Sequence, residues 1–254
     1  MMARSKSGDG DSRGRLDSLL RNQAPGHAPD AFGRAVRQAE AVVAMENCIA
    51  VVSNLAEGSS RIIAGKFADT VGLTDYVSEN SIWERKILSM MTEEEQQRKF
   101  IAELRFFHYL RKVVASKRDE YYLSAGLRFC TADGRLIDVA HRMYYVYDPM
   151  SAAVAAAICL YVPLTFGRAG KSFVVNSVTG LYEELTHSSD SNVLSSRCRQ
   201  VLSLIDSGMK SSEIAAALNI SVHTVNRHRQ AILESLNVKN SYEACRIAKS
   251  MSLI

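Results

Sequence analysis

The chain has 254 residues, and at about 150 residues per domain this length predicts one large domain or a pair of modest ones. Hydrophobic residues make up 47% of the sequence and charged residues 23%, which excludes a collagen-like, wholly disordered or disulfide-scaffold chain. The formal net charge of +4 says little by itself about a partner.

All of the excess positive charge lies in the last quarter of the chain. Residues 191–254 contain eight Lys or Arg side chains and four Asp or Glu side chains, whereas the preceding 190 residues hold 23 of each sign. A basic segment attached to a neutral body favours nucleic acid or another anionic surface as its partner.

Cysteine spacing and the character of the N-terminus point to the cytoplasm. The five cysteines form no C-x-x-C pair, which argues against a disulfide framework and against a zinc site, so no metal is expected. Residues 1–15 lack the apolar segment of a signal peptide, and export is not expected. The uncharged run Pro149–Gly167 is interrupted near both ends by Pro, Ser, Thr and Gly, so we expect a loop and a buried strand and no membrane contact.

The first half of the chain predicts a tail, a helix and a hairpin. Residues 1–28 are rich in Gly, Ser, Asp and Arg, which predicts a disordered tail. Apolar spacing from Asp30 predicts a helix that ends near Asn47. The short apolar runs Cys48–Ser53 and Arg61–Ala64 enclose turn-forming residues and predict a β-hairpin.

A helical block and three longer strands follow. Thr92 and Glu95 form a capping-box pattern at the start of a long helix. The runs Tyr121–Cys130 and Arg135–Tyr147 are joined by an Asp-Gly turn and predict a second hairpin, and Ala153–Leu164 predicts a further strand. Two strands, helices and then three strands predict an α+β fold rather than a βαβ series.

The last 60 residues predict four short helices. The first begins at the N-cap Ser195 and ends before Gly208, and the second is capped by Ser211. A tight turn leads to the third helix at about Val222–Leu236, and the fourth follows Asn240.

The outward stripe of the third predicted helix is polar. His223, Asn226, Arg227 and Gln230 fall at i, i+3, i+4 and i+7, opposite an apolar stripe. The major groove of DNA admits one helix, and Asn, Gln and Arg can make paired hydrogen bonds to adenine or guanine edges. Two short helices joined by a tight turn are therefore suited to reading DNA.

A motif runs in one register through this segment. Its matches are Leu194-Ser195-x-Arg197, Gln200-Val201-Leu202, Ser212-Glu213-Ile214-Ala215, Leu218, Ile220-Ser221, Thr224-Val225-Asn226-Arg227-His228 and Leu236-x-Val238. In this register the segment resembles the LuxR-type (GerE-type) helix-turn-helix family. One position departs, because Cys198 stands where the family has a Glu at the N3 position of the first helix. Loss of this half of a capping box should lower the stability by about 0.5 to 1 kcal/mol and should leave the fold intact.

The resemblance implies roles for individual residues. Base contacts are implied for Asn226, Arg227 and Gln230, with His223 at the margin of the contact. Phosphate contacts are implied for Lys210, Ser211, Arg229, Lys239, Asn240 and Ser241. A dimerisation surface is implied for Ala244, Ile247, Ala248 and Met251, and with it a homodimer on a pseudo-palindrome in double-stranded DNA. Thr224 and His228 match the motif but are expected to have structural roles.

The N-terminal part resembles a PAS-like sensor domain. The resemblance rests on the order of the elements and on motifs at Ile63–Phe67 and Asp133–Val139. It implies one curved antiparallel sheet with a helical block, and a ligand of unknown identity between the two. No cofactor is predicted.

The candidate sensor pocket is formed by His141, Met143 and Tyr145, which share one face of a strand, together with Trp83. For His141, a haem or metal role and a hydrogen-bonded core histidine are both open. The second is favoured because no other ligand stands out.

An enzyme is not expected. Gly167–Ser172 superficially resembles a phosphate-binding loop, but Thr165 stands where the first glycine is required. No G-x-S-x-G or H-E-x-x-H pattern occurs.

The predicted organisation is a disordered tail (1–28), a PAS-like sensor domain (29–165), a linker that can hold a small hairpin (166–193) and a LuxR-type domain (194–254). The predicted function is a cytoplasmic, dimeric, DNA-binding transcriptional regulator whose sensor domain responds to a small molecule or a partner. The alternative is an interaction or oligomerisation scaffold whose N-terminal domain binds another protein.

Overall fold

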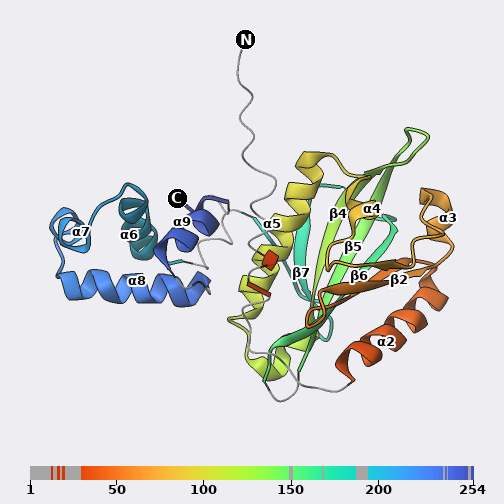
Figure 1. Ribbon diagram of the computed structural model, residues 1–254, viewed down its shortest axis with the longest axis horizontal. Coiled ribbons are helices and arrows are strands. Elements are labelled where there is room, and N and C mark those ends of the chain that lie inside the picture. Colours follow the sequence, from red (N-terminus) through yellow and green to blue (C-terminus); the bar gives the residue numbers. More distant parts are fainter. Residues whose placement is uncertain are drawn as a thin grey trace, which may run out of the picture.

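The computed structural model describes residues 13, 16, 17, 19, 20, 30–148, 151–167, 169–186, 194–236, 238, 240–250 and 253–254. Figure 1 shows a sheet flanked by helices and, at the C-terminal end of the chain, a group of helices without strands. The fold is α+β, as the order of the predicted elements indicated.

The helices of the sheet-containing region are α2 (Ala31–Glu46), α3 (Phe67–Val71), α4 (Arg85–Leu88), α5 (Glu93–Leu110) and the 3-10 helix η1 (Ala115–Glu120). The strands are β1 (Ile49–Asn54), β2 (Ser59–Ala64), β3 (Ser78–Glu79), β4 (Tyr121–Cys130), β5 (Leu136–Tyr147), β6 (Val154–Pro163), β7 (Ser172–Asn176) and β8 (Tyr182–Glu184).

Among the described residues these strands form one antiparallel sheet in the order β3-β2-β1-β6-β5-β4-β7-β8. The central pair β1 and β6 joins the early hairpin to the later strands, with Val51 opposite Cys159. Two strands, a helical block and three strands thus close into a single sheet, which is the architecture that the PAS-like resemblance implied.

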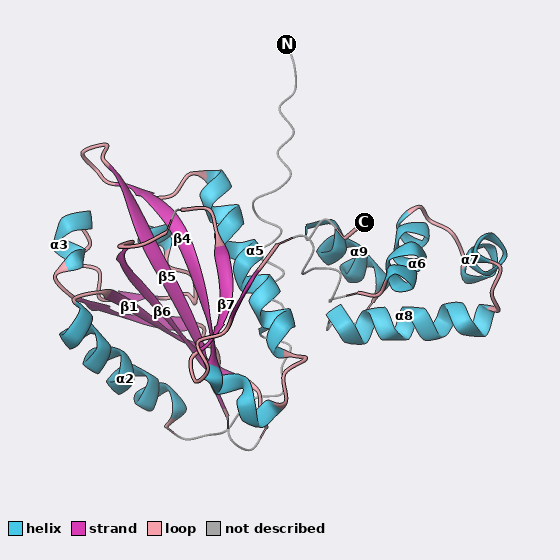
Figure 2. Cartoon of the chain, turned by 180° about the vertical axis from the view of Figure 1, so that it is seen from behind, coloured by secondary structure: helices cyan, strands magenta, loops and turns pink. Residues whose placement is uncertain are grey.

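Helices cover both faces of the sheet (Figure 2). The side chains of Ile49 and Val51 pack in the same core cluster as α5, and those of Ala50 and Val52 pack with α2. Alternation along β1 therefore buries every residue of the strand, because each face meets a helix.

Helix α5 begins at the N-cap that the sequence predicted. The Thr92 hydroxyl accepts a hydrogen bond from the Glu95 backbone N–H at 3.2 Å. The Glu95 carboxylate does not complete the capping box, since it pairs with Arg98 at 2.8 Å and accepts from the Arg128 backbone N–H at 3.3 Å. The start of α5 is thus tied to β4.

The strands β7 and β8 lie in the segment expected to be a linker. They form the small hairpin that the sequence allowed, and β7 pairs with β4 from Tyr121 opposite Asn176 to Ala125 opposite Ser172. Gly180 makes the turn with a φ of 72°. The hairpin extends the sheet, and the connection to the C-terminal helices is correspondingly shorter.

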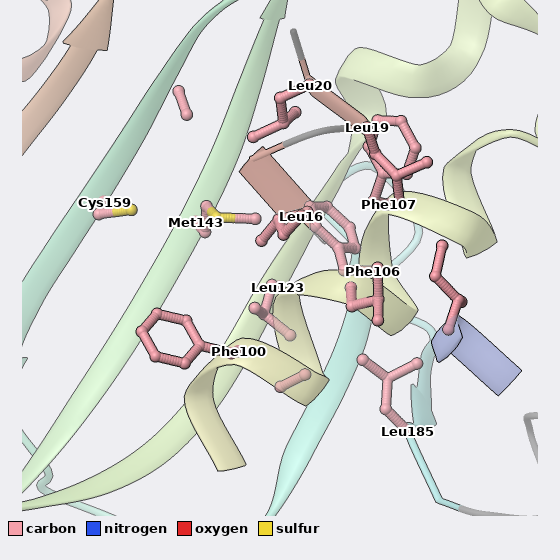
Figure 3. Packing of buried hydrophobic residues seen from close by; sticks show 14 of the residues in the cluster. Leu16, Leu19, Leu20, Phe100, Phe106, Phe107, Leu123, Met143, Cys159 and Leu185 are labelled. Atoms are coloured by element: carbon pink, nitrogen blue, oxygen red, sulfur yellow. The ribbon is translucent and has the colours of Figure 1, made fainter. Parts of the chain in front are cut away.

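The expectation of a disordered tail is wrong for part of residues 1–28. Leu16, Leu19 and Leu20 are buried in the core cluster on the α5 side of the sheet (Figure 3). The average composition of residues 1–28 did not predict this burial, because it is polar overall, whereas three leucines on one side of a helix are enough to pack on an apolar surface. The other residues of the predicted tail, apart from Arg13 and Asp17, lie outside the described residues.

The C-terminal region consists of α6 (Ser196–Asp206), α7 (Ser211–Leu218), α8 (Val222–Leu236) and α9 (Ser241–Ser250), within its described part. Its core contains Val201, Leu202, Ile214, Val225 and Ile232, all buried. No helix in the described part of the chain is long and apolar enough to cross a membrane.

Candidate nucleic-acid interface and core cavity

Helix α8 has one buried and one exposed face. Val225, Ile232 and Leu236 are buried against the other helices. His223, Asn226, Arg227 and Gln230 are all exposed. The structure thus brings the four predicted base-contacting residues together on one open helical face.

The turn between α7 and α8 sets the relation of the two helices. Asn219 takes a left-handed conformation with a φ of 51° at the end of α7. The Ser221 hydroxyl then accepts from the Thr224 backbone N–H at 3.1 Å, which caps the start of α8. This local hydrogen bonding produces the tight turn that the sequence predicted.

The start of α7 differs from the prediction. Its N-cap is Lys210, whose backbone N–H donates to the Glu213 carboxylate at 2.7 Å, and Ser211 is the first helical residue. The Ser211 hydroxyl is therefore available for contacts with α8. It donates to Oδ1 of Asn226 at 3.2 Å.

Arg229 joins the starts of α7 and α9. Its guanidinium donates to the hydroxyl of Ser211 at 3.2 Å and to that of Ser241 at 3.1 Å. Helix N-termini present unpaired backbone N–H groups that attract phosphate. Arg229 therefore holds two such ends beside α8 and adds its own positive charge.

The exposed polar side chains of α8 differ in how free they are. Arg227 makes no hydrogen bond or ion pair with any residue that the structure describes. Gln230 donates to the Glu234 carboxylate at 2.9 Å. Arg227 can thus contact a base without breaking an interaction within the described part of the chain, whereas Gln230 must first break its hydrogen bond to Glu234.

The motif departure at Cys198 has a structural counterpart. Ser195 still caps α6 by accepting from the Cys198 backbone N–H at 3.2 Å. The Cys198 sulfur lies 3.6 Å from Nδ1 of the half-buried His228. This contact between α6 and α8 supports the structural role expected for His228.

Three residues of the predicted dimerisation surface are not on the surface. Ala244, Ile247 and Ala248 are buried in the core of this chain, so the prediction that they face a second copy is wrong. Their apolar spacing on α9 reflects packing against α6 and α8. Two predicted residues, Met251 of this surface and Lys239 of the phosphate contacts, lie outside the described residues.

The predicted sensor pocket residues Trp83, His141, Met143 and Tyr145 are all buried between the sheet and α5. Trp83, Met143 and Tyr145 line a small cavity of about 30 Å³, and His141 does not. Leu16 and Leu20 line the same cavity.

A cluster of buried charges borders this cavity. The Lys99 ammonium lies 2.6 Å from the Glu103 carboxylate and 3.5 Å from that of Glu84, and all three side chains are at most 3% exposed. The Tyr161 hydroxyl donates to Glu84 at 3.1 Å. The sequence prediction missed this cluster, although Lys99 and Glu103 are spaced by four residues within the apolar stripe of α5.

The charges alter one another's ionisation. Burial opposes the charged form of Lys99, but Glu103 and Glu84 outweigh it and raise the pKa of the ammonium. Burial raises the pKa of Glu103, against the attraction of Lys99. Burial and the Lys99 charge together hold the pKa of His141 well below its ordinary value, so the imidazole is neutral.

His141 is a core histidine without the expected hydrogen bond. Neither ring nitrogen has a hydrogen-bond partner among the described residues, and Nε2 lies 3.7 Å from Glu103. The ring instead stacks on Tyr161, with centroids 4.9 Å apart. Glu103, His141 and Cys159 place donor atoms within 4.8 Å of one another, but the Lys99 ammonium already neutralises Glu103. We therefore interpret Glu103 as the partner of Lys99 in a buried ion pair and not as a metal ligand.

The end of α5 reaches the C-terminal region. Arg111, which follows α5, donates to the carbonyl oxygen of Ser235 near the end of α8 at 3.5 Å. His108 in the last turn of α5 is buried, and burial, with the nearby Arg111 and Lys112, lowers its pKa to about 3. Helix α5 thus lines the core cavity, and Arg111 directly after it contacts α8.

Comparison with known proteins identifies the C-terminal region. Residues 192–248 match the GerE family model, described as bacterial regulatory proteins of the luxR family. No curated protein matches the chain.

Several solved structures are similar over most of the chain. The phage VqmA–DPO complex has 14% identity, covers 87% of this chain and 90% of its own, and has a TM-score of 0.28. The Vibrio cholerae VqmA–ligand–DNA complex has 14% identity, coverages of 85% and 88%, and a TM-score of 0.29. Escherichia coli SdiA has 16% identity, coverages of 95% and 98%, and a TM-score of 0.24. All three scores are below 0.5, so the assignment rests on the family match and on the motif. Residues 192–248 are a LuxR-type domain of bacterial regulatory proteins, and an α+β domain built on the eight-stranded sheet precedes them.

Proposed function

We propose that this chain is a sequence-specific DNA-binding transcriptional regulator. Its LuxR-type domain binds double-stranded DNA as a homodimer, and its PAS-like domain receives the signal. The observation that carries the proposal is the open polar face of α8, flanked by two helix N-termini that Arg229 holds in place. The protein acts in the cytoplasm and without catalytic chemistry.

The two kinds of DNA contact fall to different residues. Asn226, Arg227 and Gln230 read base edges in the major groove, and His223 lies at the margin of the same face. The phosphate contacts come from the residues around the helix N-termini: Lys210, Ser211, Arg229, Lys239, Asn240 and Ser241.

The homodimer uses exposed residues of α9 in place of its buried ones. Tyr242 is 73% exposed, and the Arg246 guanidinium lies 5.8 Å from the centre of its ring. An aromatic side chain stacked with arginine is a common anchor at protein interfaces. This pair supports a dimer contact on the outer side of α9.

The input site is the cavity between α5 and the sheet. Its lining combines apolar side chains with the buried Lys99 and Glu103, a mixture typical of small-molecule sites. Since α5 carries Lys99 in this lining and is followed by Arg111 at α8, a shift of α5 on ligand binding would alter the α8 contact.

The DNA-binding proposal is tested by selecting duplexes from a random library and measuring their affinity across a salt series. Binding is expected to weaken with salt at a slope of about −0.9 per phosphate contacted. Lys210→Ala should reduce both affinity and slope. Lys117→Ala, which removes the same charge from η1 of the PAS-like domain, should leave both unchanged. If no duplex is bound, or if binding is independent of salt, the proposal is wrong.

A further inference from the structure

A short segment near the N-terminus occupies the core of the PAS-like domain. Its described residues are Arg13, Leu16, Asp17, Leu19 and Leu20, which are helical, and we call them the N-terminal strap. The three leucines fall at i, i+3 and i+4, so they share one side of the helix. Leu16 and Leu19 are each 1% exposed, which is the burial of a core residue and not of a surface tail.

Two of these leucines enter the candidate ligand cavity. Leu16 and Leu20 line it together with Met143, Tyr145 and Cys159. Figure 3 shows Leu16 directed toward Met143 on the sheet and Leu19 directed toward Phe107 on α5. Leu19 is therefore as buried as Leu16 but does not line the cavity.

The polar side of the strap is anchored at the cavity rim. Asp17 accepts a hydrogen bond from the indole N–H of Trp83 at 3.1 Å. The Arg13 guanidinium lies 5.7 Å from the centre of the same ring. Trp83 is the single tryptophan of the chain, so its spectroscopic signal reports directly on the strap.

With the strap in place the cavity holds only about 30 Å³, room for about one water molecule. The Tyr145 hydroxyl in its lining is buried and has no hydrogen-bond partner among the described residues. A buried hydroxyl without a partner is costly unless a ligand or water completes it. The cavity thus has an unused polar group and an apolar volume filled by two leucines.

We propose that the N-terminal strap is an intramolecular occupant of the sensor cavity and that a small ligand binds by displacing it. The apolar body of the ligand takes the place of Leu16 and Leu20, and a neutral polar group of the ligand hydrogen-bonds to Tyr145. The cavity lining contains Glu84 and Glu103 against a single ammonium, Lys99, which disfavours an anionic ligand. This inference rests on the proposed input role of the cavity.

Competition with the strap sets the ligand affinity. A ligand that binds only the open cavity has an apparent affinity equal to its intrinsic affinity multiplied by the fraction of molecules in which the strap is undocked. Weakening the strap therefore tightens ligand binding, even where the changed residue touches no ligand.

The test uses the full chain and phenol, a neutral ring with one hydroxyl, with benzene as the probe that lacks the hydroxyl. Binding is followed by NMR through the single indole N–H resonance of Trp83. In wild type, phenol should move this resonance to its position in Asp17→Ala, the variant without the strap anchor. Phenol should bind more tightly than benzene, and Tyr145→Phe should remove that difference.

Variants of the strap separate competition from simple cavity formation. Leu16→Ala/Leu20→Ala should bind phenol at least about tenfold more tightly than wild type. Leu19→Ala removes an equally buried strap leucine that does not line the cavity, so it should tighten phenol binding without enlarging the cavity. Leu127→Ala on β4 is the matched control, because Leu127 is equally buried but belongs neither to the strap nor to the cavity lining, and it should bind as wild type does. Asp17→Ala creates no cavity and should also tighten binding, which keeps the test decisive if the double variant does not fold.

The proposal is overturned if Asp17→Ala and wild type bind phenol equally, or if phenol binds while the Trp83 resonance stays in place. These measurements involve no DNA. If the chain binds no duplex but phenol competes with the strap, the proposed DNA-binding function is wrong and the strap proposal stands. If the chain binds DNA but phenol does not compete with the strap, the strap proposal is wrong and the DNA-binding function stands.

Discussion

The guanidinium of Arg229 donates to the hydroxyl of Ser211 at 3.2 Å, so a residue on α8 holds the first turn of α7. The same guanidinium reaches Ser241 at the start of α9 at 3.1 Å. One planar side chain thus positions both helix N-termini beside the exposed face of α8. Arg229 therefore links α7, α8 and α9 into one continuous surface.

Arg229→Lys should loosen this surface, because a lysine ammonium cannot replace the planar fork that spans the two hydroxyls. Loss of one of the two hydrogen bonds should lower the free energy of unfolding by about 1 kcal/mol and weaken binding to all duplexes alike. Denaturant unfolding and DNA titration measure the two effects. Arg199→Lys on α6 is the control, and an equal loss in both variants would contradict the role of Arg229.

Arg227→Ala should relax sequence preference. Arg227 is exposed and without a partner among the described residues, so its guanidinium can make a bidentate contact to one base. Its loss should cost about 1 to 3 kcal/mol on the preferred duplex and much less on others. Parallel titration of preferred and scrambled duplexes measures the difference. Lys210→Ala should weaken all duplexes equally, and an equally uniform loss in Arg227→Ala would refute base contact.

Lys99→Met should destabilise the PAS-like domain strongly. The variant leaves the buried Glu84 and Glu103 without their counter-charge, a loss of about 3 to 5 kcal/mol in the free energy of unfolding. Arg98→Met is the neighbouring control, since Arg98 forms an exposed ion pair with Glu94 that should contribute at most about 1 kcal/mol. Similar losses in the two variants would show that the Lys99 pair is not buried in solution.

Acidification should destabilise the protein through His108. Its pKa is about 3 in the fold, below the value of about 6.5 for an unfolded histidine, so the unfolded chain binds more protons between these values. The contribution of His108 to stability is therefore present above pH 6.5 and falls as the pH drops toward 3. At pH 5 the loss should be about 2 kcal/mol.

His108→Leu should remove this part of the pH dependence. Unfolding free energies of wild type and variant, measured at pH 7 and at pH 5, give the difference of the two pH profiles. Identical profiles would mean that His108 titrates equally in the folded and unfolded chain, which its burial opposes.

Local chemistry made several elements predictable. Thr92 and Ser195 accept hydrogen bonds from backbone groups three residues ahead, so the starts of α5 and α6 are encoded within four residues of sequence. The polar face of α8 followed from helical spacing alone. The start of α7 was misassigned because the Glu213 carboxylate accepts from the backbone N–H of Lys210 and not of Ser211. Lys210 is therefore the N-cap, and Ser211 is the first residue of the helix.

Contacts between distant segments were not predictable in the same way. Glu84 and Lys99 lie on different elements and come together only in the folded chain. The position of Lys99 on the apolar stripe of α5 does not show which residue will pair with it. Ala244, Ile247 and Ala248 have the spacing of an apolar face, but spacing does not say whether the chain itself or a second copy covers that face. The three strap leucines posed the same question and were assigned to a disordered tail.

By itself the sequence determined the helix caps at Thr92 and Ser195, the polar face of α8 and the LuxR-type motif, because each depends on residues within one or two turns of a helix. The tertiary structure decided which apolar faces are covered, which buried charges are paired and which side chains fill the core cavity. Those outcomes depend on the free energy of burying groups from distant parts of the chain against one another, and that term has no local signature.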